Sequence, residues 1–65
     1  MSIRILNRRD TARKISTSPT QIDRLVLAKE FPQPIWISPR RKGWVEEEID
    51  AWLKSKMEAR VRSRS

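Results

Sequence analysis

The chain contains neither cysteine nor histidine. Without cysteine it can form no disulfide bond and no cysteine-ligated zinc site. Without histidine it lacks the side chain that most often serves as a general base or a transition-metal ligand. We therefore expect a cytoplasmic domain that is not an enzyme and carries no cofactor or metal.

Long apolar stretches are also missing. No run approaches the roughly 18 residues that a membrane span needs, and the first seven residues are too short and too polar for a signal peptide. Leu, Ile, Val and Phe together account for only 15 of the 65 residues. A chain of this size buries only about 60% of the surface that its unfolded form exposes, so we expect a thin core. The organisation predicted is one domain over residues 1–59 and a disordered basic tail over residues 60–65.

Positive charge is abundant and unevenly distributed. The formal net charge is +7, and residues 1–44 contain ten Lys or Arg against three Asp or Glu, whereas residues 45–65 contain five of each. The whole excess therefore lies in the first two thirds of the chain. A basic surface of this kind is typical of a domain that binds a polyanion, and nucleic acid is the partner that we expect.

Two helices with recognisable starts are predicted in this basic part. Asn7 is an acceptable N-cap for a short helix over residues 8–14. Ser18, Pro19 and Gln21 together form an N-cap, a proline at the first helical position and a capping box, which start a second helix over residues 18–28. Its inward face repeats at helical spacing and comprises Ile22, Leu25 and Val26. Two short helices joined by a brief turn form a helix-turn-helix.

A hairpin and a third helix follow. Residues 35–37 are β-branched and aromatic and predict a strand, residues 38–41 a basic turn, and residues 42–44 the returning strand. Residues 45–58 predict a helix with acidic residues in its first turn, where the helix dipole favours them. Residues 3–6 could add a short strand or an anchoring arm. The predicted fold is mainly α with a small β-hairpin: a winged helix-turn-helix of three helices and a two-stranded wing.

The outward face of the second helix supplies the candidate base-reading residues. Arg pairs with guanine, Gln with adenine and a Thr methyl with the thymine methyl in the major groove, and the start of a recognition helix does most of this reading. Thr20, Gln21 and Arg24 are therefore the main candidates, and Asp23 could accept from cytosine. An ordinary solvated helix face is the alternative interpretation.

The remaining cations are candidates for backbone contacts. Three successive cations at a hairpin tip repel each other, and a polyanion relieves that repulsion in the minor groove or on phosphates. A solubilising loop is the alternative. The predicted backbone-contacting set is Arg40, Arg41 and Lys42 in the wing, with Ser18, Arg8, Arg9, Arg13 and Lys14 in or near the first two helices.

Tryptophans and carboxylates suggest two further functions, which we consider weaker. Trp44 and Trp52 are expected in the core, and Trp36 is the one candidate for stacking on single strands, although packing is favoured. Glu46 and Asp50 share a helix face, but helix-start electrostatics already explain them, so a catalytic role is disfavoured.

The order of motifs resembles a known family. After the helix-turn-helix come Phe31-Pro32-Gln33-Pro34-Ile35, then Arg40-Arg41-Lys42-Gly43-Trp44, then Glu48-Ile49-Asp50-Ala51-Trp52-Leu53. Over residues 5–56 this is similar to the AlpA-like prophage regulators, small winged-helix proteins related to excisionases and MerR-type DNA-binding domains. The resemblance implies a bacterial regulator of a prophage or mobile element, associated with the nucleoid when bound to DNA. It implies a recognition helix at 18–28, a wing at 35–44, and structural roles for the FPxP segment and the tryptophans.

Three departures from the family pattern stand out. Glycine is common where this chain has Ser16 and Lys29, and an aromatic residue is common at Asp23. Two roles fit the family equally: an excisionase that works with a site-specific integrase, and a transcriptional regulator. Cooperative self-association on adjacent DNA sites is compatible with both. The alternatives outside duplex DNA binding are an RNA-binding module and a protein-interaction module that inhibits a regulator.

Overall fold

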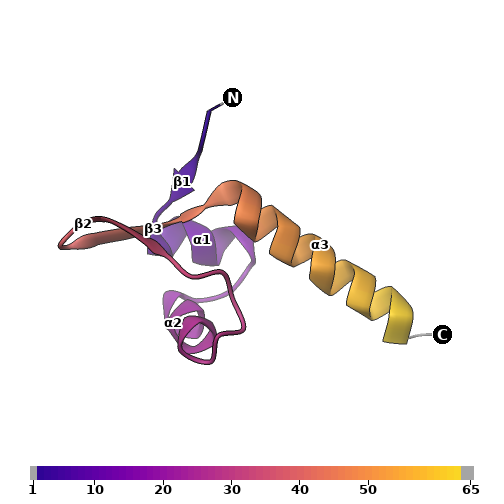
Figure 1. Ribbon diagram of the computed structural model, residues 1–65. Helices are drawn as coiled ribbons and strands as arrows, with labels where there is room; N and C mark the ends of the chain where they lie inside the picture. Colours follow the sequence, from indigo (N-terminus) through magenta and orange to yellow (C-terminus); the bar gives the residue numbers. More distant parts are fainter. Residues whose placement is uncertain (1, 64–65) are drawn as a thin grey trace.

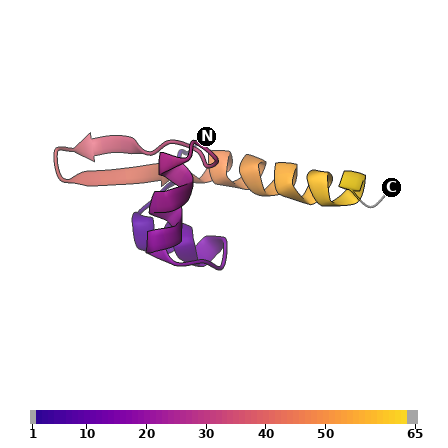
Figure 2. The ribbon, with the colours of Figure 1, turned by 90° about the horizontal axis from the view of Figure 1, so that it is seen from below.

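A computed structural model describes residues 2–63, and side chains as far as residue 60. The elements in chain order are β1 (Ile5–Leu6), α1 (Arg8–Lys14), α2 (Pro19–Leu27), β2 (Ile35–Ser38), β3 (Arg41–Val45) and α3 (Glu46–Ser63) (Figure 1). The β2–β3 hairpin and α3 extend in opposite directions along one axis (Figure 2). Helices α1 and α2 lie together on one side of this axis. The predicted winged helix-turn-helix is confirmed.

Both short helices begin as their sequences predict. The Asn7 side chain accepts from the backbone N–H of Asp10 at 2.7 Å, and the Ser18 hydroxyl accepts from the N–H of Gln21 at 3.2 Å. Pro19 occupies the first helical position, where no N–H is needed. Among the described residues only this half of the expected capping box is present, since the Gln21 side chain makes no bond back to Ser18.

The ends of both helices explain how the chain turns without glycine. Ser16 and Lys29 have φ angles of 59° and 60°, the left-handed conformation that favours glycine. At α1 the Thr17 N–H donates to Ala12 O at 2.8 Å and the Ser16 N–H to Arg13 O at 3.1 Å. This pair of bonds is a Schellman motif, and residues 25–30 repeat it at the end of α2. The helix-turn-helix therefore uses two strained non-glycine residues at the positions where the family commonly has glycine.

The sheet has three strands rather than the two of the predicted wing. Its order is β1-β3-β2, with all pairs antiparallel. Ile5 pairs with Val45, and Leu6 pairs with Trp44. Residues 5–6 therefore form a strand rather than a free arm, and they join the wing to the helical body. In the hairpin Trp36 pairs with Lys42, and the register shifts between Trp36 and Ser38.

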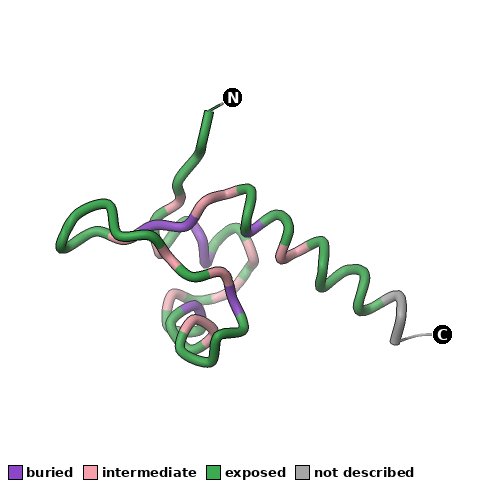
Figure 3. Tube along the Cα trace, viewed as in Figure 1, coloured by how far each residue is buried: buried purple, intermediate pink, exposed green. Residues whose placement is uncertain are grey.

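The core is small and lies where β3, the two short helices and the start of α3 meet (Figure 3). Its buried apolar residues are Ala12, Ile22, Phe31, Trp44 and Ile49. The indole N–H of Trp44 donates to Pro32 O, and that of Trp52 donates to Glu30 O, both at 2.8 Å. These bonds and the edge-on contacts of Phe31 with both indoles hold the 30–34 segment. The structural role that the resemblance implied for these residues is thus explained.

Helix α3 is longer than the sequence indicates. It runs to Ser63, whereas the prediction ended near residue 58. Its first half packs on the body through Ile49, Trp52 and Leu53, and residues 54–60 are all exposed. The helix thus includes residues 60–63 of the expected tail, and residues 64 and 65 lie outside the described residues. Within residues 2–63, none of the helices combines the length and the apolar character that crossing a membrane requires.

Candidate nucleic-acid interface

Helix α2 presents the predicted reading residues to solvent. Ile22 is fully buried, and Leu25 and Val26 pack against the core, so the inward face is as predicted. The residues expected to read bases, Thr20, Gln21, Asp23 and Arg24, are all exposed. Leu27 is the most exposed large apolar residue of the helix, at 86%. The first two turns of α2 therefore offer a polar, accessible surface on a helix, the kind of element that a major groove admits.

Asp23 does not stand free on that surface. The Arg8 guanidinium donates from Nε to one Asp23 oxygen at 3.0 Å and from a terminal nitrogen to the other at 2.7 Å. This hydrogen bonding lowers the pKa of the Asp23 carboxyl, and the Coulombic attraction of Arg8 and Lys42 adds to the effect. A bidentate pair of this geometry ties the start of α1 to the side of α2. Two residues predicted to contact DNA are thus bound to each other in the free protein.

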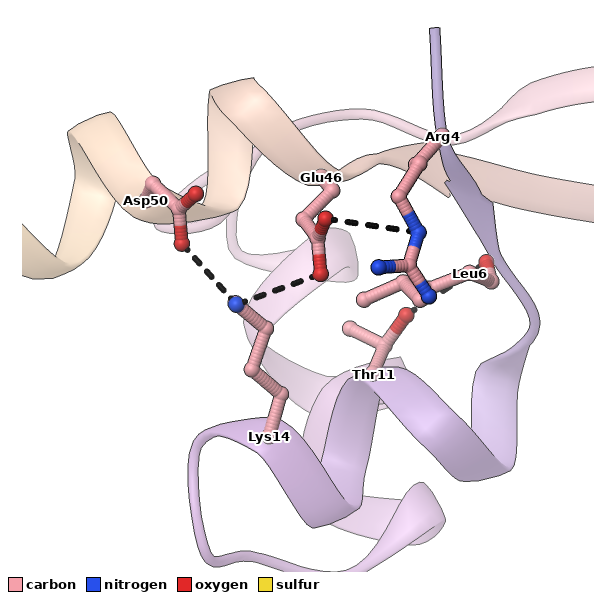
Figure 4. A network of polar contacts seen from close by, with 6 residues as sticks. All are labelled: Arg4, Leu6, Thr11, Lys14, Glu46 and Asp50. Atoms are coloured by element: carbon pink, nitrogen blue, oxygen red, sulfur yellow. Dashed lines mark hydrogen bonds and ion pairs between the residues drawn. The ribbon is translucent and has the colours of Figure 1, made fainter.

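Lys14 is engaged in a similar way by the start of α3 (Figure 4). Its ammonium group lies 3.0 Å from an Asp50 oxygen and 3.3 Å from a Glu46 oxygen. Hydrogen bonding to Asp50 is the main reason that the pKa of Lys14 is raised. Glu46 also contacts Arg4 at 3.7 Å, and its backbone N–H donates to Arg4 O. The carboxylates that could have suggested an acid–base pair therefore join α3 to α1 and to the N-terminal strand.

The other predicted backbone contacts are accessible. Arg9 and Arg13 on α1 are exposed, and they take part in no ion pair among the described residues. Arg40, in the turn between β2 and β3, and Arg41, the first residue of β3, are likewise exposed. Arg8 and Lys14 are thus paired with acids of neighbouring helices, whereas these four arginines face solvent.

Lys42 occupies a third kind of environment, between two indoles. Its ammonium nitrogen lies 5.7 Å from the Trp36 ring centroid and 5.8 Å from the Trp44 ring centroid. Trp44 is fully buried, as predicted, but Trp36 is 64% exposed. The prediction that Trp36 packs in the core was wrong. β2 is an edge strand, and Trp36 pairs with Lys42 beyond the point where Trp44 enters the core, so no element is left to cover it.

An open recess lies between the start of α1 and the wing. Cations contribute half of its lining residues, namely Arg8, Arg40, Arg41 and Lys42, and the apolar side chains of Ile5 and Ile37 contribute to its wall. Sequence reasoning missed this recess because its two sides are far apart in the chain. The one signal that could have found it is that both sides are basic. Arg8, which is paired with Asp23, brings the recess next to the side of α2.

The arrangement defines a class of protein: a winged helix-turn-helix with an exposed, capped second helix and a basic wing. The chain matches, over residues 4–57, the family described as Prophage CP4-57 regulatory protein (AlpA). It belongs to this family of prophage regulatory proteins, as the sequence motifs indicated. A search of curated proteins gives no match, and a search of solved structures gives none either.

Proposed function

We propose that this chain is a sequence-specific, double-stranded-DNA-binding protein of a prophage or mobile element, without enzymatic activity. α2 enters the major groove, and Thr20, Gln21 and Arg24 contact base edges. The wing lies on the phosphate backbone or in the minor groove. The observation that carries the proposal is the combination of an exposed start of α2 with a wing whose arginines, Arg40 and Arg41, both face solvent.

The family supports a regulatory role, and the charge distribution supports DNA as the target. Phosphate contacts provide affinity without sequence information, whereas base-edge contacts provide specificity. The exposed arginines of α1 and the wing suit the first task, and the neutral or singly charged side chains of α2 suit the second. A domain of 7.7 kDa covers few base pairs. We therefore propose that several copies bind adjacent sites.

Mobility-shift titrations on a duplex that contains the cognate binding site, at several salt concentrations, test whether α2 provides specificity and the wing arginines provide affinity. Arg24→Ala should weaken binding by about 1–3 kcal/mol and relax specificity at one base pair. Arg40→Ala or Arg41→Ala should weaken binding to all sequences alike. Each should also make the slope of log K against log salt concentration shallower by about 0.9 for each phosphate that is no longer neutralised. Lys54→Ala is the matched control, because it removes one exposed charge from α3, away from α2 and the wing. Unchanged binding by Arg24→Ala would rule out α2 as the reader.

Three further measurements test the roles and the alternatives that remain. Footprinting on the genomic DNA around the gene shows whether sites cluster in an attachment region, as for an excisionase that recruits an integrase, or in a promoter. Competition between duplex DNA and duplex RNA of the same sequence tests the RNA alternative. Sedimentation of the free protein tests the adjacent-copies proposal, which a stable dimer in solution would contradict.

A further inference from the structure

Trp36 is the most conspicuous exposed group of the wing. It is 64% exposed, whereas Trp44 is fully buried and Trp52 is half-buried against the core. Exposing a large aromatic side chain to water is unfavourable compared with burying it, and such side chains are enriched where a protein contacts a partner. The sheet places Trp36 on an edge strand, beyond the buried pair of Trp44 with Leu6. Trp36 is therefore available to a ligand that reaches the wing.

The surroundings of Trp36 indicate the chemistry of that ligand. Lys42 lies directly opposite in the register and holds its ammonium group over one face of the indole. Lys42 and Arg8 line the same recess, and Arg8 is paired with Asp23, so the wing adjoins the side of α2. Arg40 and Arg41 follow at the turn. An apolar surface set among cations, beside the proposed reading helix, suits a ligand with both anionic and apolar faces.

We propose that the free face of Trp36 packs on the deoxyribose of the DNA backbone beside the minor groove, while Lys42 contacts the adjacent phosphate. This inference rests on the proposed function and adds a non-ionic contact to it. A wedge between base pairs needs both faces of the inserted group, and Lys42 already occupies one face of the indole. The Trp36–Lys42 pair therefore acts as a single unit that binds one nucleotide of backbone.

A sugar contact has a different salt signature from an arginine contact. Trp36→Ala should weaken binding about tenfold. This is the effect expected if roughly half of the area of one indole face is buried against the sugar and that apolar contact is lost. The loss should be the same at every salt concentration and for every sequence, because no counterion release is involved. Trp36→Phe should recover most of the affinity. Met57→Ala is the matched control: Met57 is a large apolar residue that is 57% exposed, but it lies on the part of α3 that is remote from the wing.

Acrylamide quenching of tryptophan fluorescence provides a second test that does not depend on a variant that might lose affinity for other reasons. In the free protein the readily quenched component should belong to Trp36 and should disappear in Trp36→Phe. Saturating duplex DNA should protect this component, whereas vesicles of anionic phospholipid should not. The proposal is overturned if DNA binds and Trp36 stays quenchable, if vesicles alone protect it, or if Trp36→Ala binds as tightly as Met57→Ala. If the unaltered protein binds no duplex in the shift assay, the proposed function itself fails.

Discussion

The pair between Arg8 and Asp23 leads to an unusual prediction: removing a charge from the proposed interface should strengthen DNA binding. Asp23→Asn deletes a negative charge on the flank of α2 and leaves the Arg8 guanidinium without its carboxylate partner. Both side chains are nearly half exposed, at 43% and 45%, so Arg8 can turn toward solvent without crossing the core. Arg8 then becomes available to a phosphate.

The magnitude follows from counterion release. One additional phosphate contact makes the slope of log K against log salt concentration steeper by about 0.9. The advantage of Asp23→Asn over the unaltered protein should therefore shrink by about 3.5-fold between 50 and 200 mM salt. The gain should extend to unrelated duplexes, because a phosphate contact carries no sequence information.

The assay is a titration of labelled duplex by fluorescence anisotropy at four salt concentrations. Glu30→Gln is the control for net charge, since Glu30 is exposed and its carboxylate forms no ion pair among the described residues. Arg8→Ala combined with Asp23→Asn completes a double-mutant cycle and should abolish the gain. If Asp23→Asn instead loses discrimination at one base pair, Asp23 reads cytosine and the reasoning from the ion pair is refuted.

Three predictions concern stability. Ser16→Gly and Lys29→Gly should each stabilise the fold by about 1 kcal/mol, measured by urea unfolding, because each removes left-handed strain from a side-chain-bearing residue; a loss of stability would show that the side chain compensates for the strain. Gly43→Ala should destabilise by about 1–3 kcal/mol, since the new methyl group would collide with Ile5 and lie 3.2 Å from Leu6 O; adding Ile5→Ala should restore part of the loss. The pKa of Asp23 is lowered in the folded protein, so its ionised carboxylate contributes to the free energy of unfolding. This contribution is fully present above the ordinary aspartate pKa and disappears as the pH falls through the lowered value. The melting temperatures of the unaltered protein and of Asp23→Asn should therefore converge in acid.

Features encoded locally were predictable from the sequence. The bounds of α1, the caps at Asn7 and Ser18, and the inward face of α2 each depend on residues within a few positions of one another. The hairpin was predictable for the same reason, because β-branched residues flank a proline-containing turn. The replacement of glycine by Ser16 was visible too, although only the structure shows that Ser16 itself takes the left-handed conformation.

Features that depend on distant partners were left open or missed. The sequence allowed residues 3–6 to be either a short strand or an arm, because β1 becomes a strand only by pairing with Val45 and Trp44, which lie far along the chain. Burial of Trp36 was expected from its apolar character, but a domain this small has no second layer to cover its wing. The partners of Arg8 and Lys14 lie 15 and 32 positions away, so charge counting could not distinguish paired cations from free ones.

The ion pairs change what the net charge means for DNA binding. The helix dipole alone would explain why the first turn of α3 is acidic. In the structure, however, Glu46 and Asp50 also form ion pairs with Lys14, and these pairs hold α1 against α3. Asp23 does the same for α1 and α2 through Arg8. Exposed ion pairs contribute little to the free energy of folding, so the main effect of these pairs is to orient the helices. The accessible cations that form no ion pair among the described residues include Arg9 and Arg13 on α1, Arg24 on α2, and Arg40 and Arg41 in the wing. The acids of the chain therefore do more than reduce its net positive charge: they determine which cations are free to contact phosphate, and they hold α1 against α2 and against α3.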